Sequence, residues 1–225
     1  MGPRRSARSR RCDLFGRRRL YDRHRVTGQR LFLPLLILVG GGLGLATPAD
    51  AHTSISGVGL FPNGLLHPVA VPQHLLLLIG IGLWMGRRQD RQIPPLLAAL
   101  NAGLVVGYAA TIWIDLTQIT SLTLAAMTLI AGTLLAVNRP LPSLLNVSVF
   151  ALAGLCVGLD SKPEALKANE TLLLGFGIWI GVNIIALNIM ALSAKLQHPI
   201  AVIGIRIAGS WLIAMSLILL AFELR

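Results

Sequence analysis

Two histidines and a glutamine lie in the segment LHPVAVPQHLL, which begins at Leu66. His67 and His74 are seven residues apart, so a regular helix would place both on one face, about 10.5 Å apart along its axis. That distance is too long for the two imidazoles to bind one ion. Pro68 and Pro72 disfavour a regular helix here, and a broken helix could bring the two rings closer together.

Metal binding is the chemistry that these side chains suggest. Neutral imidazole is the commonest protein ligand for late first-row metals, and the Gln73 side chain could add a carbonyl oxygen. The alternative is structural, because His67 and His74 could instead satisfy backbone carbonyls that the prolines leave without hydrogen bonds. The spacing alone does not distinguish the two roles.

The composition predicts the kind of element that must hold this segment. Of the 225 residues, 54% are hydrophobic and 13% are charged, whereas a soluble domain carries about 25% charged residues. With a mean hydropathy of +0.71, this is an integral membrane protein. Cys12 lies in a basic leader and Cys156 in an apolar segment, which excludes a disulfide scaffold and a CxxC zinc module.

The net charge of +11 is concentrated at the N-terminus. Residues 1–25 contain ten arginines and two aspartates, which leaves +8 of that total in the tail. The rest of the chain is nearly neutral and apolar, so we expect no nucleic-acid partner.

Residues 1–51 have the pattern of a basic leader followed by a signal peptide. The apolar stretch from Leu31 is short for a spanning helix and ends near the small residues Ala49 and Ala51. We predict cleavage after Ala51, which would leave a short periplasmic segment over residues 52–64. His52 would then carry a free α-amine and an imidazole that could capture a metal ion. The alternative is that the leader remains as an uncleaved helix.

Residues 65–225 are predicted to form an all-α membrane domain of six transmembrane helices. Their apolar runs lack the alternation of barrel strands, and each is close to the ~20 residues that cross the hydrocarbon core. The predicted spans are 65–85, 95–114, 117–137, 141–159, 171–194 and 200–222.

The basic residues of the connections predict the orientation. If the N-terminus is secreted, the first, third and fifth connections are cytoplasmic and should be positively charged. Those connections contain Arg87, Arg88, Arg91, Arg139 and Lys195. We therefore expect both ends of the mature chain to face the periplasm.

Small and polar residues within the spans are expected to hold the helices together, because lipid provides no hydrophobic drive for helix association. The GxxxG pairs are Gly82 with Gly86, Gly103 with Gly107, Gly154 with Gly158, and Gly177 with Gly181. The asparagines expected to bond between helices are Asn101, Asn146, Asn183 and Asn188. Arg206 should either reach the membrane surface or pair with a carbonyl or carboxylate in the bundle.

The sequence resembles the HupE/UreJ family. The residues AHT from Ala51 precede GLLHPVAVPQHLLLLIGIGLW, which is similar to the family signature HPxxGxDHLL at the start of the first mature span. The sequence RIAG at residues 206–209 extends the likeness to the last span. The resemblance implies a bacterial inner-membrane permease for nickel, sometimes cobalt, that supplies hydrogenase or urease maturation. It also implies that His67 and His74 handle the metal.

The chain departs from the family signatures at several ligand positions. Gln73 stands where the family has aspartate, which keeps a ligand oxygen but removes a negative charge. A second family signature, HGxAHGxE, falls on AGLCVGLD in the fourth span, with Ala153 and Val157 in place of histidines and Asp160 in place of the acid. Cys156 within this segment is expected to be a small packing residue rather than a ligand.

These observations lead us to expect a divergent HupE/UreJ-type permease for nickel or cobalt, embedded in the lipid bilayer. His67, His74 and Gln73 would form the metal site, His52 would capture the ion outside, and the ion would be cargo rather than a resident cofactor. The alternative is a non-transporting accessory or scaffold protein of a hydrogenase-like or urease-like system. We expect no enzymatic activity, because the spans contain no paired catalytic acids and no serine–histidine pair.

Overall fold

The structure, a computed structural model, describes residues 57–88, 90–113, 117–161 and 166–224. All of these belong to one compact unit, Asp50–Arg225. The predicted leader, its cleavage site and His52 lie outside the described residues.

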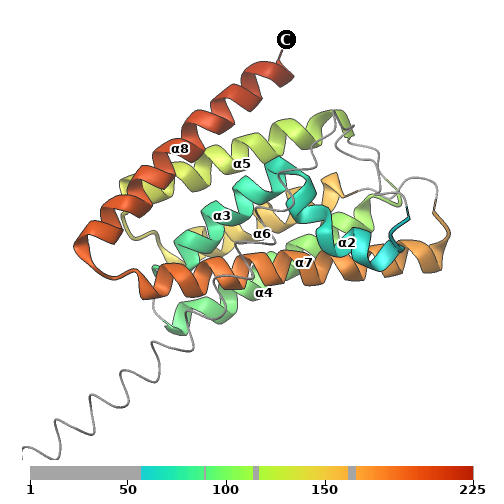
Figure 1. Cartoon of the computed structure of the whole chain (residues 1–225), viewed down its shortest axis with the longest axis horizontal. Coiled ribbons are helices and arrows are strands. Elements are labelled where there is room, and N and C mark those ends of the chain that lie inside the picture. The colour runs from blue at the N-terminus through green and yellow to red at the C-terminus, as the bar shows by residue number, and fades with distance from the viewer. Residues whose placement is uncertain (1–56, 89, 114–116, 162–165, 225) are drawn as a thin grey trace, which may run out of the picture. The chain divides into compact units, whose positions relative to one another are not determined.

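The described part of the chain is all helical, as predicted. It contains α2 (Leu60–Ala70), α3 (Pro72–Met85), α4 (Ile93–Ala110), α5 (Thr117–Val137), α6 (Ser143–Asp160), α7 (Ala168–Lys195), α8 (Pro199–Glu223) and the short 3₁₀ helix η1 (Asp90–Gln92) (Figure 1). Five of the α-helices are long and apolar enough to cross a membrane, and α2 with α3 can form a sixth span. The chain is therefore a multi-pass membrane protein.

The first span is broken rather than continuous. It begins at Leu60, before the predicted residue 65, and α2 and α3 meet at an angle of 71°. Val71 between them is extended, with φ −91° and ψ 107°, because the ring of Pro72 disfavours the helical conformation of the residue before it. Pro72 then begins α3, where a missing N–H costs nothing. Pro68 lies inside α2 and does not end it.

Helix α3 lies at the centre of the bundle. It contacts α5, α6, α7 and α8, and α2 packs mainly on α7. The other large contacts join α4 to α6 and α5 to α8, and Figure 1 shows α8 running beside α5. Nine residues of α3 are buried, from His74 to Met85, so a polar group among these nine is remote from solvent and lipid.

Glycines allow the closest helix contacts, as their GxxxG spacing predicted. A Cβ atom at Gly103 would collide with the carbonyl of Ala151 on α6, and one at Gly154 would collide with the carbonyl of Leu100 on α4. In the same way, a Cβ atom at Gly177 would collide with the carbonyl of Phe61 on α2. Backbones at this distance gain dispersion contacts that larger residues would prevent.

Side-chain hydrogen bonds join the helices at fewer places than the glycine contacts do. Asn101 and Asn183 exchange two amide hydrogen bonds between α4 and α7, with N···O distances of 3.1 and 2.8 Å. The indole of Trp84 donates to Oδ1 of Asn146 at 3.0 Å. Asn188, in contrast, bonds to the Ile184 carbonyl of its own helix. Three of the four asparagines therefore link helices as predicted.

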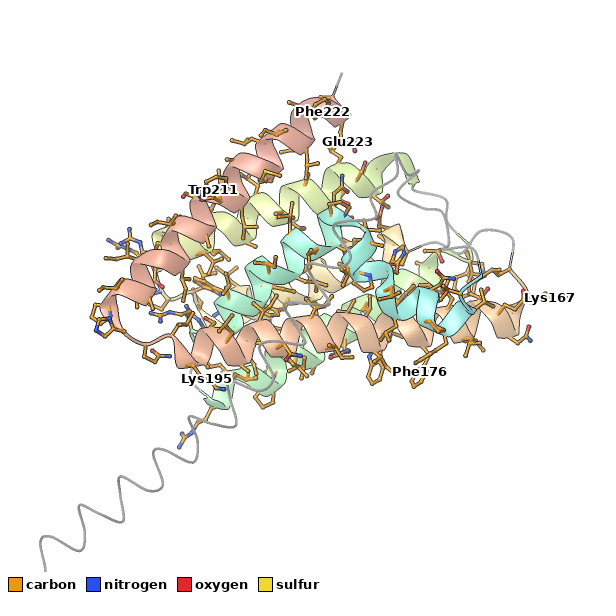
Figure 2. The ribbon with its side chains drawn as sticks, in the orientation of Figure 1. Lys167, Phe176, Lys195, Trp211, Phe222 and Glu223 are labelled. Atoms are coloured by element: carbon orange, nitrogen blue, oxygen red, sulfur yellow. The ribbon has the colours of Figure 1, made fainter. Side chains whose placement is uncertain are left out.

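Basic residues gather where α3, α5 and α7 end, whereas Lys167 lies at the beginning of α7. Arg206 on α8 donates from Nε to the carbonyl of Ala136 at 2.9 Å. This hydrogen bond joins α8 to the last turn of α5. The guanidinium of Arg88 lies 3.9 Å from the centre of the Trp84 ring. Burial, and the charge of Arg87 beside it, lower the pKa of Arg88. Lys195 and Lys167 mark the two opposite ends of α7 in Figure 2.

Large apolar side chains cover the outside of the helices. Trp211 on α8 is 67% exposed and Phe222 is 71% exposed, and Figure 2 labels both along that helix. Because such residues would be unfavourable in water and suit hydrocarbon, this surface fits a lipid environment.

Candidate metal site at the break of the first span

The break in the first span brings His67 and His74 together. Their ring centroids are 5.1 Å apart and the rings meet edge to face, at 62°. Two imidazoles that bind one tetrahedral ion through nitrogens at about 2 Å have centroids roughly 5 Å apart, so this separation suits a shared ion. A continuous helix would have kept the rings apart by about twice that distance.

A third polar group faces His74 from another helix. Oδ2 of Asp160, the last residue of α6, lies 2.9 Å from Nε2 of His74. The approach departs from the straight geometry of a strong hydrogen bond. His74 has no exposed surface and Asp160 is 6% exposed, so the pair is inside the protein. When ionised, a buried carboxylate beside the His74 ring provides negative charge where water screens it little.

Asp160 is the site residue that the sequence-based prediction missed. The signal was present, because Asp160 occupies the acidic position of the second signature in α6, which also keeps Gly154 and Gly158. What the sequence does not reveal is that the end of α6 meets the beginning of α3. The glycine contacts between α4 and α6 help to fix the position of that end.

The rest of the second signature does not add a ligand. Ala153 and Val157 have no exposed surface and belong to the hydrophobic core, so the positions of the two family histidines are filled with apolar packing. Cys156 is buried one turn before Asp160, and the side chain of Thr123 on α5 lies near its thiol. It also packs in the hydrophobic core, as the sequence predicted.

Gln73 is half-buried in the first turn of α3, next to His74 in the chain. Its amide makes no hydrogen bond to either ring nitrogen of His74. The structure thus brings His67 and His74 together, and the role of Gln73 as a ligand stays a prediction. The predicted role of His52 also stays a prediction, because that residue is outside the described part.

The arrangement can accept a cation but does not form a closed cage. In the described ranges, no group of three or more histidine, cysteine, aspartate or glutamate side chains is placed to hold a metal ion. Two imidazoles and one nearby carboxylate would leave coordination positions open. An open site suits an ion that binds and leaves, because conduction requires binding that is weak enough to be reversed.

Comparison with known proteins identifies one family. The family described as HupE / UreJ protein matches residues 38–219, which is most of the chain. No curated protein and no solved structure matches it.

Proposed function

The chain belongs to the HupE/UreJ family, and on that basis we propose that it is a permease for a divalent transition-metal cation, nickel or cobalt. His67 and His74 bind the ion in passage, and Gln73 supplies an oxygen from the first turn of α3. The ion is cargo, and no enzymatic step is proposed.

The observation that carries this proposal is the group of His67, His74 and Asp160, in which His74 and Asp160 are buried and His67 is half-buried with its Nε2 atom inside the protein. Ionisable side chains inside a membrane protein are costly, so two histidines at one break in a span with an aspartate against one of them need a functional reason. Imidazole nitrogens prefer late first-row metals over magnesium or calcium. The carboxylate offsets part of the cost of taking a divalent cation out of water.

We place the protein in the bacterial inner membrane with both mature termini in the periplasm. Five basic residues lie at or beyond the ends of α3, α5 and α7, which the positive-inside rule assigns to the cytoplasm. The site lies at the other end of the bundle, at the start of α3 and the end of α6. A cation would therefore reach the histidines early, after capture outside by His52.

A second candidate function follows from the apolar residues in α6. With Ala153 and Val157 where the family has histidines, the chain has lost two of the side chains that could pass an ion onward. In this alternative, the protein is a non-transporting membrane accessory or scaffold of a hydrogenase-like or urease-like maturation system. The retained histidine pair favours the permease.

Metal accumulation in cells tests the proposal. Cells that express the wild type should accumulate more nickel or cobalt than cells that carry the double variant His67→Ala, His74→Ala. The matched control is His198→Asn, because His198 is an exposed cap of α8 at the far end of the bundle, and asparagine also caps helices. Equal accumulation in all four strains, including one without the protein, would overturn the permease and favour the scaffold.

A further inference from the structure

We propose that Asp160 is a positioning residue that holds His74 with its proton on Nε2, so that Nδ1 is the atom that binds the metal. The proposal rests on the function proposed above and adds the atom that binds and the group that orients it.

The first step concerns the proton between the two side chains. Nε2 of His74 and Oδ2 of Asp160 are 2.9 Å apart inside the protein, and two acceptors would repel each other at that distance. An ionised carboxylate can only accept, so the proton lies on Nε2. A protonated Nε2 has no lone pair for a metal ion, even though the contact with Asp160 is too bent to count as a hydrogen bond.

The second step concerns the other nitrogen of the same ring. Nδ1 of His74 is buried and has no hydrogen-bond partner among the described residues. In the neutral ring with its proton on Nε2, Nδ1 carries a lone pair. A buried acceptor of this kind lacks the compensation that polar groups normally find inside proteins, and a cation would provide it.

The third step joins these two facts. Histidines that bind metals usually donate their second ring N–H to a carboxylate or carbonyl, which fixes the ring and makes the ligand nitrogen more basic. Asp160 on α6 places its carboxylate 2.9 Å from Nε2 of His74 on α3, which is where such a partner would lie, although the angle is not that of a hydrogen bond. His67, whose ring centroid is 5.1 Å away, is close enough to provide a second nitrogen to the ion.

The assignment explains why α6 retains the acid of the family signature but not its two histidines. As a positioning group, Asp160 stabilises the correct form of His74 even though Ala153 and Val157 have removed other ligands. The assignment also gives Asp160 a different role from that of the family aspartate at the position of Gln73. That family aspartate would lie directly beside the ion.

Nitrogen NMR on the full chain in lipid nanodiscs tests the assignment. The protein is labelled with ¹⁵N-histidine, and the signals of His74 are identified by their loss in His74→Gln. In the metal-free wild type we expect a proton on Nε2 and none on Nδ1. With Zn²⁺ as a diamagnetic probe, the Nδ1 signal should move and Nε2 should keep its proton.

Variants of Asp160 supply the second measurement. Asp160→Asn should weaken Zn²⁺ binding by about 10- to 100-fold and leave part of the His74 population with its proton on Nδ1. Asn188→Ala is the control, since Asn188 is exposed on α7 and bonds only within its own helix. Unchanged Zn²⁺ affinity in Asp160→Asn would overturn the positioning role.

The two proposals fail in different ways. Zinc bound to Nε2, or a proton on Nδ1 in the metal-free wild type, would overturn this assignment even in a protein that transports metal. Zinc bound to Nδ1 in a protein that accumulates no metal in cells would support the assignment and overturn the permease.

Discussion

His74 combines complete burial with two different nitrogen environments. Nε2 lies 2.9 Å from Oδ2 of Asp160 without the geometry of a hydrogen bond, and Nδ1 has no hydrogen-bond partner among the described residues. A polar side chain in this position costs stability unless it is compensated. Its presence in the first turn of α3 is therefore better explained by a ligand than by packing.

Replacing Gln73 with aspartate should increase metal uptake. The change restores a carboxylate in the first turn of α3, next to His74, where it adds charge attraction for a cation in a setting of low dielectric constant. An acid is also favourable near the N-terminus of a helix. Metal accumulation by Gln73→Asp measures the effect.

The same change in a His74→Ala background is its control. Without the imidazole we expect no gain from the new aspartate, because the two groups act on the same ion. A gain that persists without His74 would mean that the aspartate attracts cations on its own and that Gln73 is not part of the site.

At the residue scale, sequence patterns predicted the histidine pair but not its partner. His67 and His74 lie in one short segment, so their association depends on local chain geometry that two prolines make visible. Asp160 is more than 80 positions away from His74, and its contact depends on which helices are neighbours. Only the resemblance to a family signature marked this acid at all.

At the element scale, close helix contacts hold the site in place. The contact between α4 and α6 is made at Gly103, Gly107, Gly154 and Gly158, and it fixes the helix that ends in Asp160. The bend at Val71 does the same for the histidines, because it sets the direction of α3 relative to α2.

Gly154→Ala should destabilise the protein. Its Cβ would meet the backbone of Leu100 and Leu104, so α4 and α6 would have to separate at a cost of about 1–3 kcal/mol. The greater helix propensity of alanine offsets about 1 kcal/mol of this. We expect a lower unfolding temperature in detergent.

Gly204→Ala is the matched control for that substitution. Gly204 lies in α8, and a Cβ there would have nothing within 4 Å, so only the gain in helix propensity remains. Its unfolding temperature should not fall. If both variants lose the same stability, helix packing at glycine is not the cause.

The asparagine pair between α4 and α7 should show a small coupling. Asn101 and Asn183 exchange two hydrogen bonds, and interhelical bonds in membranes are typically worth about 0.6 kcal/mol. A double-mutant cycle with Asn101→Ala and Asn183→Ala, followed by unfolding in detergent, should give a coupling of that order. Strict additivity would show that each asparagine is satisfied by the carbonyl of its own helix.

Most element boundaries could be predicted because each span is an uninterrupted apolar run. The predicted span over residues 117–137 coincides with α5, and the other ends differ by a few residues. The first span is the exception. Its prolines indicated an irregular helix, but whether α2 would stack on α3 or turn by 71° depends on its contact with α7, which is not local.

At the scale of the whole molecule, the positive charges predict the orientation. A reporter placed between Arg87 and Arg91 should be cytoplasmic, and one fused after Arg225 should be periplasmic. Fusions to a reporter that is active in only one compartment provide the measurement. A cytoplasmic C-terminus would mean that the leader is kept as a span or that the broken first span does not cross the membrane.

Nickel uptake by proteoliposomes tests the central claim most directly, because it removes every other transporter of the cell. The purified chain is reconstituted, and radioactive nickel inside the vesicles is counted over time for the wild type, His74→Ala and His198→Asn. We predict uptake by the wild type and His198→Asn that exceeds that of empty vesicles, and uptake by His74→Ala that does not. Wild-type uptake equal to that of empty vesicles, or uptake unchanged by His74→Ala, would contradict the claim that the buried histidine site carries a metal ion.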